Sequence, residues 1–123
     1  MANSAGYHES EAHLTVPTID MHRALASLQE ELEAIDWYQQ RIDATGDAEL
    51  REILRHNRDE EQEHAAMVLE WIRRRDSGFA AKLRAYLFTE GSITGRESAV
   101  EGNGAAPARR VVTSVGSLRG GGR

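Results

Sequence analysis

The sequence contains no cysteine, which excludes disulfide bonds and thiolate metal ligands. Any bound metal must be held by carboxylate, imidazole, hydroxyl or water, which favours iron, manganese, calcium or magnesium over a structural zinc cage. No apolar run approaches the roughly 20 residues that a membrane span needs. Residues 1–11 are polar and lack a hydrophobic signal core, so we expect neither export nor membrane association.

Prolines and aromatic residues are also scarce: two prolines and an aromatic fraction of 6%. Acidic residues outnumber basic ones, and the net charge of −5 at pH 7 argues against general nucleic-acid binding. Apolar residues make up 40% of the chain, which suffices for a core only if most of them share one stripe. We therefore expect one small cytoplasmic domain in this chain of 123 residues.

Composition divides the chain into four segments. Residues 1–18 are polar and close with Pro17, which predicts a flexible N-terminal arm. Residues 19–90 have helical periodicity, and a flexible linker rich in Gly, Ala, Ser and Arg follows over residues 91–112. Residues 113–123 regain apolar character and form a tail.

Within the periodic segment we expect two long helices and a short third one. The first is predicted over residues 20–43 and the second over residues 48–75. Gly46 suits a helix end and Asp47 the next N-cap. Apolar residues at a spacing of four predict the third helix over residues 79–88.

A hairpin of two amphipathic helices cannot bury its apolar stripes alone, because so small a core falls short of the entropy cost of folding. The missing surface is most simply a second copy of the hairpin. The predicted fold class is therefore all-α: a two-helix antiparallel hairpin plus a short third helix, which forms a four-helix bundle on dimerisation.

Polar side chains interrupt the apolar stripes of both long helices. Glu31 lies inside the stripe of the first helix, and Asn57, Glu61 and His64 occupy the centre of the second. Burying a carboxylate is costly unless a counter-charge or a metal compensates it. Glu61 and His64 are three residues apart and point the same way, and the small Ala65 leaves room beside them.

The expected hairpin brings these side chains to one height, because Glu31 and Glu61 lie at nearly equal distances from the turn at Gly46. Doubling Glu31, Glu61 and His64 across a two-fold axis gives four carboxylates and two imidazoles, the ligand set of di-iron carboxylate bundles. The alternatives are a buried Glu–His pair without metal, or a rotated stripe that leaves these groups solvated. Tyr38, two turns from Glu31, either assists a ligand or is an ordinary tyrosine at the edge of the core.

Two further clusters lie on outer faces of the helices. The cluster on the first helix consists of Glu30, Glu33 and Trp37. The cluster on the second helix consists of His56, Glu60 and Glu63. Each is either a solvated face or a weak divalent-cation site, and the first would draw Fe²⁺ toward the inner site if it lined a subunit contact.

Three segments of this sequence resemble one protein family. They are residues 30–38 (EELEAIDWY), 56–67 (HNRDEEQEHAAM) and 86–91 (YLFTEG). Together they resemble the encapsulated ferritins, bacterial and archaeal cargo proteins of encapsulin nanocompartments, and the likeness covers about residues 20–95. The resemblance implies a ferritin-like helical protomer that pairs into dimers and assembles as a ring-shaped homodecamer of such units.

The resemblance also implies an activity, the oxidation of Fe²⁺ to Fe³⁺ by O₂ with two irons bound per dimer, and storage of the mineral inside the encapsulin shell. The implied catalytic and metal-binding residues are Glu31, Glu61 and His64, with Tyr38 adjacent. The implied metal-uptake residues are Glu30, Glu33 and Trp37. An implied outer-surface site for calcium or another divalent cation comprises His56, Glu60 and Glu63.

The tail contains the segment SVGSLR at residues 114–119, which resembles the short C-terminal peptide by which such cargo docks on the inner wall of the shell. The implied docking residues are Val115, Gly116, Leu118 and Arg119. Val115 and Leu118 would fill apolar pockets while Arg119 meets an acidic rim; the alternative is a disordered end. Two other functions stay open: a non-catalytic metal-binding helical oligomer, and a structural cargo protein without metal.

Overall fold

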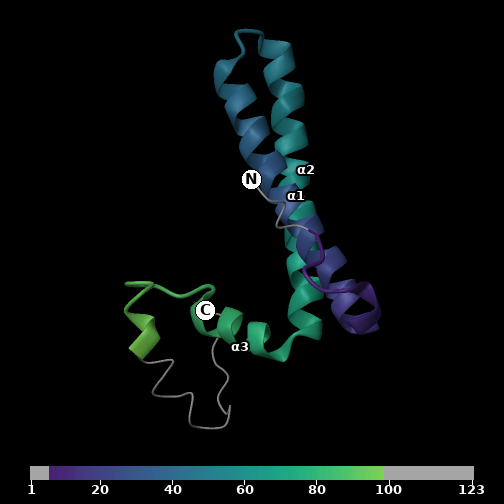
Figure 1. The fold of residues 1–123 in the computed structure, drawn as a ribbon. Coiled ribbons are helices and arrows are strands. Elements are labelled where there is room, and N and C mark those ends of the chain that lie inside the picture. The colour runs from purple at the N-terminus through teal and green to yellow at the C-terminus, as the bar shows by residue number, and fades with distance from the viewer. Residues whose placement is uncertain (1–5, 99–123) are drawn as a thin grey trace. The chain divides into compact units, whose positions relative to one another are not determined.

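The computed structural model describes residues 6–98, and every regular element in this range is helical, without strands. A 3-10 turn (Glu11–His13) precedes α1 (Val16–Ala44), α2 (Ala48–Arg75) and α3 (Ser77–Tyr86). The predicted all-α class is confirmed, and α2 has the predicted bounds. α1 and α2 lie side by side and antiparallel as a hairpin (Figure 1). None of the described helices combines the length and apolar character needed to cross a bilayer.

The start of α1 differs from the prediction. The helix begins at Val16 rather than at residue 20, because Thr15 is its N-cap and its hydroxyl accepts the backbone N–H of Thr18 at 3.3 Å. Pro17 lies in the first turn, where its missing N–H costs nothing. The interpretation of Pro17 as the end of a loose arm was therefore wrong: it helps to start the helix.

The turn between α1 and α2 is capped in two ways. Asp47 is the predicted N-cap of α2, and its carboxylate accepts a first-turn backbone N–H at 2.8 Å. Gly46 does not adopt the left-handed conformation expected of a helix-ending glycine; Thr45 ends α1 with extended backbone. Arg51 reaches back instead, with Nε donating to the carbonyl of Ile42 at 3.3 Å and the guanidinium donating to the carbonyl of Thr45.

α3 starts and ends two residues earlier than predicted. Asp76 caps its start, because Oδ1 accepts the backbone N–H of Phe79 at 2.9 Å. At the other end the hydroxyl of Thr89 donates to the carbonyl of Tyr86 at 2.7 Å. Phe88 lies beyond the helix with a φ of 59°, a left-handed conformation that breaks the helical path.

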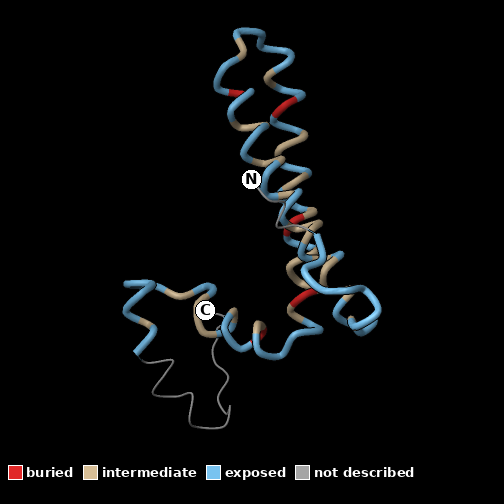
Figure 2. Tube along the Cα trace, in the orientation of Figure 1, coloured by how far each residue is buried: buried red, intermediate tan, exposed pale blue. Residues whose placement is uncertain are grey.

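The chain divides into two units, with the boundary along the sequence between Ala80 and Ala81, and the hairpin belongs to the first unit. Few positions of the hairpin are buried (Figure 2). Its buried side chains are Ile42, Leu54, Ala65 and Ile72. Leu32 and Ile53 stay more than half exposed, at 53% and 55%. So small a core does not offset the entropy lost on ordering two long helices, so the hairpin needs further apolar contacts to be stable.

Candidate metal centre

Three potential metal ligands converge at mid-height of the hairpin. Among residues 6–98, one group of three such side chains has its ligand atoms within 4.8 Å of one another: Glu31, Glu61 and His64. The Nδ1 atom of His64 lies 3.3 Å from Oε1 of Glu61 and 3.7 Å from Oε1 of Glu31. The hairpin register therefore brings the three residues together as the sequence predicts.

Local geometry explains the convergence. Glu61 and His64 lie one turn apart on α2, so both point toward the same side of that helix. Glu31 reaches them from the middle of α1. Ala65 follows His64 and is buried, with 8% exposure, and its small side chain leaves space beside the group.

The two carboxyl groups shift each other's pKa in opposite directions. The pKa of Glu31 is raised, mainly because its carboxyl is hydrogen-bonded to Glu61 and secondly because it is desolvated. The pKa of Glu61 is lowered, mainly because its carboxylate accepts that hydrogen bond. The side chain of Glu31 is 24% exposed and that of Glu61 is 23% exposed. Within residues 6–98, both carboxylates lie within ion-pair distance of His64, and neither pairs with an arginine or a lysine. A cation bound between the two carboxylates would therefore compensate their negative charge.

A third carboxylate faces the opposite edge of the His64 ring. Oε1 of Glu60 lies 3.7 Å from Nε2 of His64, and Oε2 of Glu60 lies 3.7 Å from Nε2 of His56. From the sequence alone, Glu60 is predicted only as a member of the outer cluster with His56 and Glu63. The spacing of four between Glu60 and His64 was the signal that could have revealed this contact.

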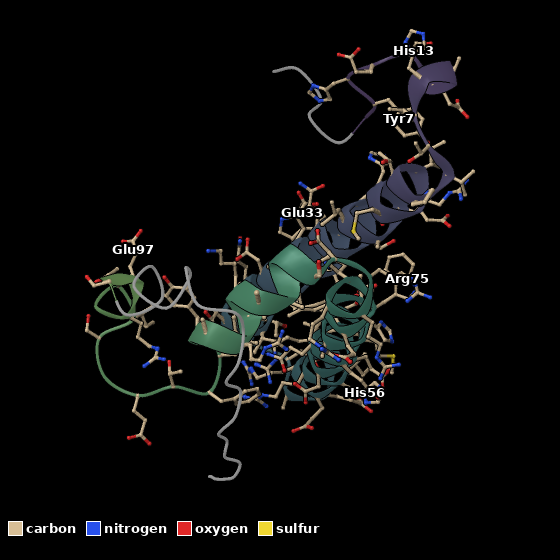
Figure 3. The ribbon with its side chains drawn as sticks, turned by 90° about the horizontal axis from the view of Figure 1, so that it is seen from below. Tyr7, His13, Glu33, His56, Arg75 and Glu97 are labelled. Carbon is tan, nitrogen blue, oxygen red and sulfur yellow. The ribbon has the colours of Figure 1, made fainter. Side chains whose placement is uncertain are left out.

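The remaining predicted site residues lie outside this group. Those of the outer faces are exposed: Glu30, Glu33, Trp37, His56 and Glu63. Figure 3 shows Glu33 on α1 and His56 on α2 projecting from different sides of the hairpin. The role of these residues in metal uptake or surface binding stays a prediction. The tail residues predicted to dock lie beyond the described range.

Tyr38 lies on the same side of α1 as Glu31, but two turns away. Seven residues correspond to a rise of about 10.5 Å along the helix. The guanidinium of Arg41 lies over the ring of Tyr38, 5.3 Å from the ring centroid, and forms a cation–π contact. Tyr38 thus flanks the three-residue group and is not part of it.

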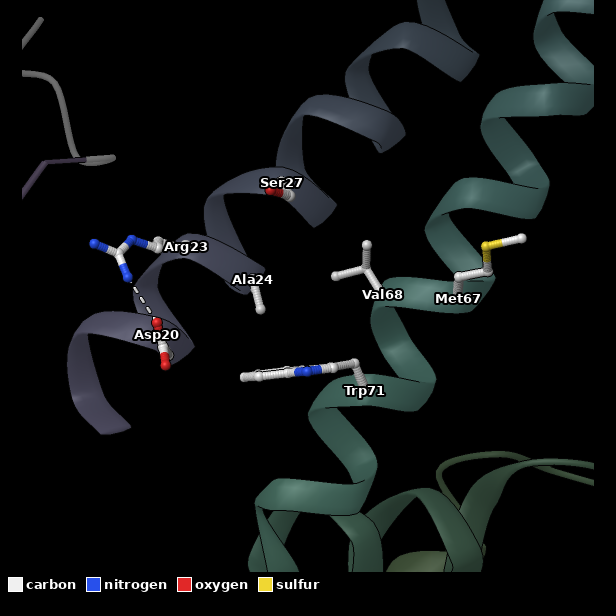
Figure 4. Close-up of a pocket in the computed structure, with 7 residues that line it drawn as sticks. All are labelled: Asp20, Arg23, Ala24, Ser27, Met67, Val68 and Trp71. Carbon is white, nitrogen blue, oxygen red and sulfur yellow. Dashed lines mark hydrogen bonds and ion pairs between the residues drawn. The ribbon is translucent and has the colours of Figure 1, made fainter. Parts of the chain in front are cut away.

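An open groove lies between α1 and α2 (Figure 4). Its lining residues are Asp20, Arg23, Ala24, Ser27, Met67, Val68 and Trp71. Ser27 precedes Glu31 by four residues and Val68 follows His64 by four, so the groove lies one turn beyond the group on the same helix faces. The side chain of Met67 is 58% exposed, and Trp71 lines the groove beside it.

Sequence comparisons identify several relatives. The family described as EncFtn-like matches residues 6–90. The encapsulated ferritin-like protein of Rhodospirillum rubrum is 50% identical over 127 residues, covering 96% of this chain and 91% of that protein. The ferritin-like protein of Thermotoga maritima is 53% identical over 96 residues, covering 78% and 84% of the two chains.

Two further matches extend this likeness. The encapsulin nanocompartment cargo protein EncC of Myxococcus xanthus is 40% identical over 103 residues, covering 76% of this chain and 79% of that protein. Among solved structures, the crystal structure of protein ne0167 from Nitrosomonas europaea is similar, with a TM-score of 0.70 and 59% identity. That match covers 72% of this chain and 97% of the other.

Proposed function

The chain belongs to the EncFtn-like family, and on this basis we propose that it is a ferroxidase whose di-iron centre forms between two copies of the hairpin. The observation that carries the proposal is the convergence of Glu31, Glu61 and His64 within 4.8 Å. One copy supplies two carboxylates and one imidazole. Two copies supply four carboxylates and two imidazoles, which is the ligand set that holds two irons in ferritin-like carboxylate proteins.

The donor set suits iron. Carboxylate oxygens and imidazole nitrogen are ligands that iron accepts. Anionic oxygens attract Fe³⁺ more strongly than Fe²⁺ because the Coulomb energy scales with charge, so this environment favours loss of an electron. Glu31 and Glu61 supply the negative charge, and neutral His64 supplies a lone pair.

Exposed apolar residues on both sides of the group support a second copy as the partner. Toward the turn, Leu50 and Ile53 of α2 are 44% and 55% exposed. In the other direction, the groove at Trp71 and Val68 is open. An apolar face interrupted by ligands is what a two-fold dimer would cover, because the same patch of each copy then meets itself.

In the proposed reaction Fe²⁺ is the substrate, and each of two ions gives one electron to the same O₂ molecule. Any proton held by the carboxyl of Glu31 leaves to solvent when iron binds, and the carboxylates of Glu31 and Glu61 then compensate the charge of the ion. His64 holds its ring between the carboxylates and keeps one nitrogen unprotonated for the metal. Tyr38 lies two turns from Glu31 on the same side of α1, and the guanidinium of Arg41 lies over its ring.

The names of two relatives support a place in a shell. The Rhodospirillum rubrum relative is named as encapsulated, and the Myxococcus xanthus relative as encapsulin nanocompartment cargo. We infer that this chain is also encapsulin cargo, assembled from dimers into a ring-shaped decamer within the lumen. The docking segment would be residues 113–123, with the ferric product stored inside the shell.

The test of the activity is anaerobic loading with Fe²⁺ followed by exposure to air in a stopped-flow spectrophotometer. We expect Fe³⁺ absorbance to rise many times faster than in buffer. Assembly with metal but without faster oxidation would support a non-catalytic metal-binding oligomer instead. Metal analysis of protein purified without chelators tests the remaining alternative, a cargo protein without metal.

A further inference from the structure

The two nitrogens of His64 face different acids. On one edge of the ring, Nδ1 lies 3.3 Å from Glu61 and 3.7 Å from Glu31. On the other edge, Nε2 lies 3.7 Å from Oε1 of Glu60. Every one of these carboxylates comes from α1 or α2, and the ring lies among them with 44% of its side chain exposed.

A neutral imidazole has one N–H donor and one lone pair, so the position of its proton decides which nitrogen can bind a metal. In the metal-free protein Nδ1 can donate to Glu61, at 3.3 Å. When a metal ion takes the place between Glu31, Glu61 and Nδ1, the ring proton must lie on Nε2. The acceptor that faces Nε2 is Glu60.

We propose that Glu60 is a positioning residue for His64: it accepts the Nε2–H of the ring, so that the Nδ1 lone pair is held toward Glu31 and Glu61 for the metal ion. This inference rests on the proposed function, because it assigns a role toward the same metal centre. It adds a residue that does not itself belong to the three-residue group.

The position of Glu60 suits this role. It precedes His64 by one turn of α2, so the contact needs no second element. Its other oxygen faces Nε2 of His56 at 3.7 Å, one turn in the opposite direction, so the carboxylate lies between two imidazoles. A separation of 3.7 Å is longer than a hydrogen bond, and a small rotation of either exposed side chain closes it.

Removing the carboxylate partner of a metal-binding histidine lowers metal affinity by a known order of magnitude. A carboxylate that accepts the second N–H of a ligating histidine fixes the tautomer and ring orientation and raises the basicity of the ligand. Its loss typically lowers metal affinity by about 10- to 100-fold. A carboxylate that acted only as a nearby negative charge would also attract a cation, so the test must separate charge from hydrogen bonding.

The experiment is anaerobic calorimetric titration of the full chain with Fe²⁺. We compare wild type with Glu60→Ala, Glu60→Gln and the matched control Glu52→Gln. Glu52 is an exposed carboxylate of the same helix that pairs with Arg55 at 3.7 Å. Circular dichroism and the thermal midpoint of each metal-free variant verify that the fold is intact.

We expect Glu60→Ala to weaken Fe²⁺ binding at the centre by about 10-fold or more. Glu60→Gln should recover most of the affinity, since its amide oxygen still accepts the Nε2–H although the charge is gone. The control should bind like wild type. Unchanged affinity in Glu60→Ala, or equal losses in the Ala and Gln variants, would overturn the positioning role.

The proposed function can fail separately. Because O₂ is absent, the titration reports binding alone. If the variants behave as expected but wild type oxidises no Fe²⁺ in air, the ferroxidase proposal fails and the role of Glu60 stands. If oxidation is rapid and Glu60→Ala binds normally, the positioning role fails and the ferroxidase proposal stands.

Discussion

Oε1 of Glu31 on α1 lies 3.7 Å from Nδ1 of His64 on α2, so an acid of one long helix meets a base of the other at mid-height of the hairpin. Glu61 completes the contact from the same turn as His64. These groups lie beside apolar side chains that stay exposed. A single hairpin therefore presents half of a ligand set on a face that still needs a partner.

Removing any of the three ligands should abolish rapid oxidation. Glu31→Ala, Glu61→Ala and His64→Ala each remove two of the six ligands from a symmetric dimer, so we expect stopped-flow rates near the background of Fe²⁺ in buffer. Glu52→Ala is the matched control, since that carboxylate is 78% exposed and lies outside the group. A near-normal rate in one ligand variant would remove that residue from the centre.

Iron binding should weaken in acid. The pKa of Glu31 is raised, chiefly by its hydrogen bond to Glu61 and then by desolvation, so this carboxyl keeps its proton to higher pH than an ordinary glutamate does. Fe²⁺ must displace that proton, so the apparent affinity should rise with pH across this range and fall as pH drops. Anaerobic titrations at a series of pH values measure this slope. An affinity that does not change between mildly acidic and neutral pH would contradict this competition between the proton of Glu31 and the metal ion.

The acid stability of α2 should depend on Glu70. Hydrogen bonds from Arg73 and then Arg74 hold the pKa of Glu70 at about 2, below its ordinary value of 4.5. A lowered folded-state pKa stabilises the native state above the unfolded-state pKa, and this contribution is lost as pH falls from about 4.5 toward 2. Glu70→Gln should therefore lower the thermal midpoint at pH 7 slightly, because the group is solvated.

The difference between wild type and Glu70→Gln should shrink and vanish near pH 2, as followed by circular dichroism. Glu52→Gln is the comparison variant, because its pairing with Arg55 is longer, at 3.7 Å. A difference that persists unchanged at pH 2 would show that Glu70 stabilises the helix by packing and not by charge.

Pairing of two copies should depend on the apolar face beside the ligands. Ile53 is 55% exposed there, so Ile53→Asp would place a charge at a contact that repeats across the two-fold axis. We expect sedimentation to show a smaller species and oxidation to slow many-fold, although every ligand is present. Gln62→Glu adds the same charge at an exposed position of α2 and controls for charge alone. If the Ile53→Asp variant still dimerises and oxidises iron normally, the interface lies elsewhere.

Docking in a shell should require the tail. Deleting residues 113–123 should prevent co-purification with a co-expressed encapsulin shell protein, because the apolar and basic side chains of SVGSLR would be lost. Deleting residues 120–123 alone is the matched control and should leave co-purification intact. Equal capture of both truncated chains would assign docking to another part of the protein.

The sequence predicted the convergence of Glu31, Glu61 and His64 because the rules involved are local. Asp47 at the N-cap and the register of the short turn place Glu31 level with Glu61, and a spacing of three aligns Glu61 with His64. The recognised family resemblance is confirmed by the match over residues 6–90. The convergence of the three side chains needed only helix periodicity and the length of one turn, whereas the family resemblance rested on the sequence segments themselves.

The features that the sequence did not predict depend on the rotamers of long side chains. Arg51 caps the end of α1 from nine residues beyond Ile42, which no local cap rule anticipates. Glu60 is grouped with His56 from the sequence; its spacing of four from His64 permits a second contact, and the side-chain rotamers decide that this contact forms. The prediction for Pro17 was wrong because a proline can either end an extended segment or begin a helix. Here the N-cap formed by Thr15 starts the helix just before Pro17.

The most direct test of the paired centre is a crystal of the full chain loaded anaerobically with Fe²⁺, with anomalous scattering recorded at the iron edge. We predict two peaks about 3.5–4 Å apart on a two-fold axis, ligated by Glu31, Glu61 and His64 from both copies. Peaks held by a single hairpin, or no anomalous density at the height of these residues, would contradict the account.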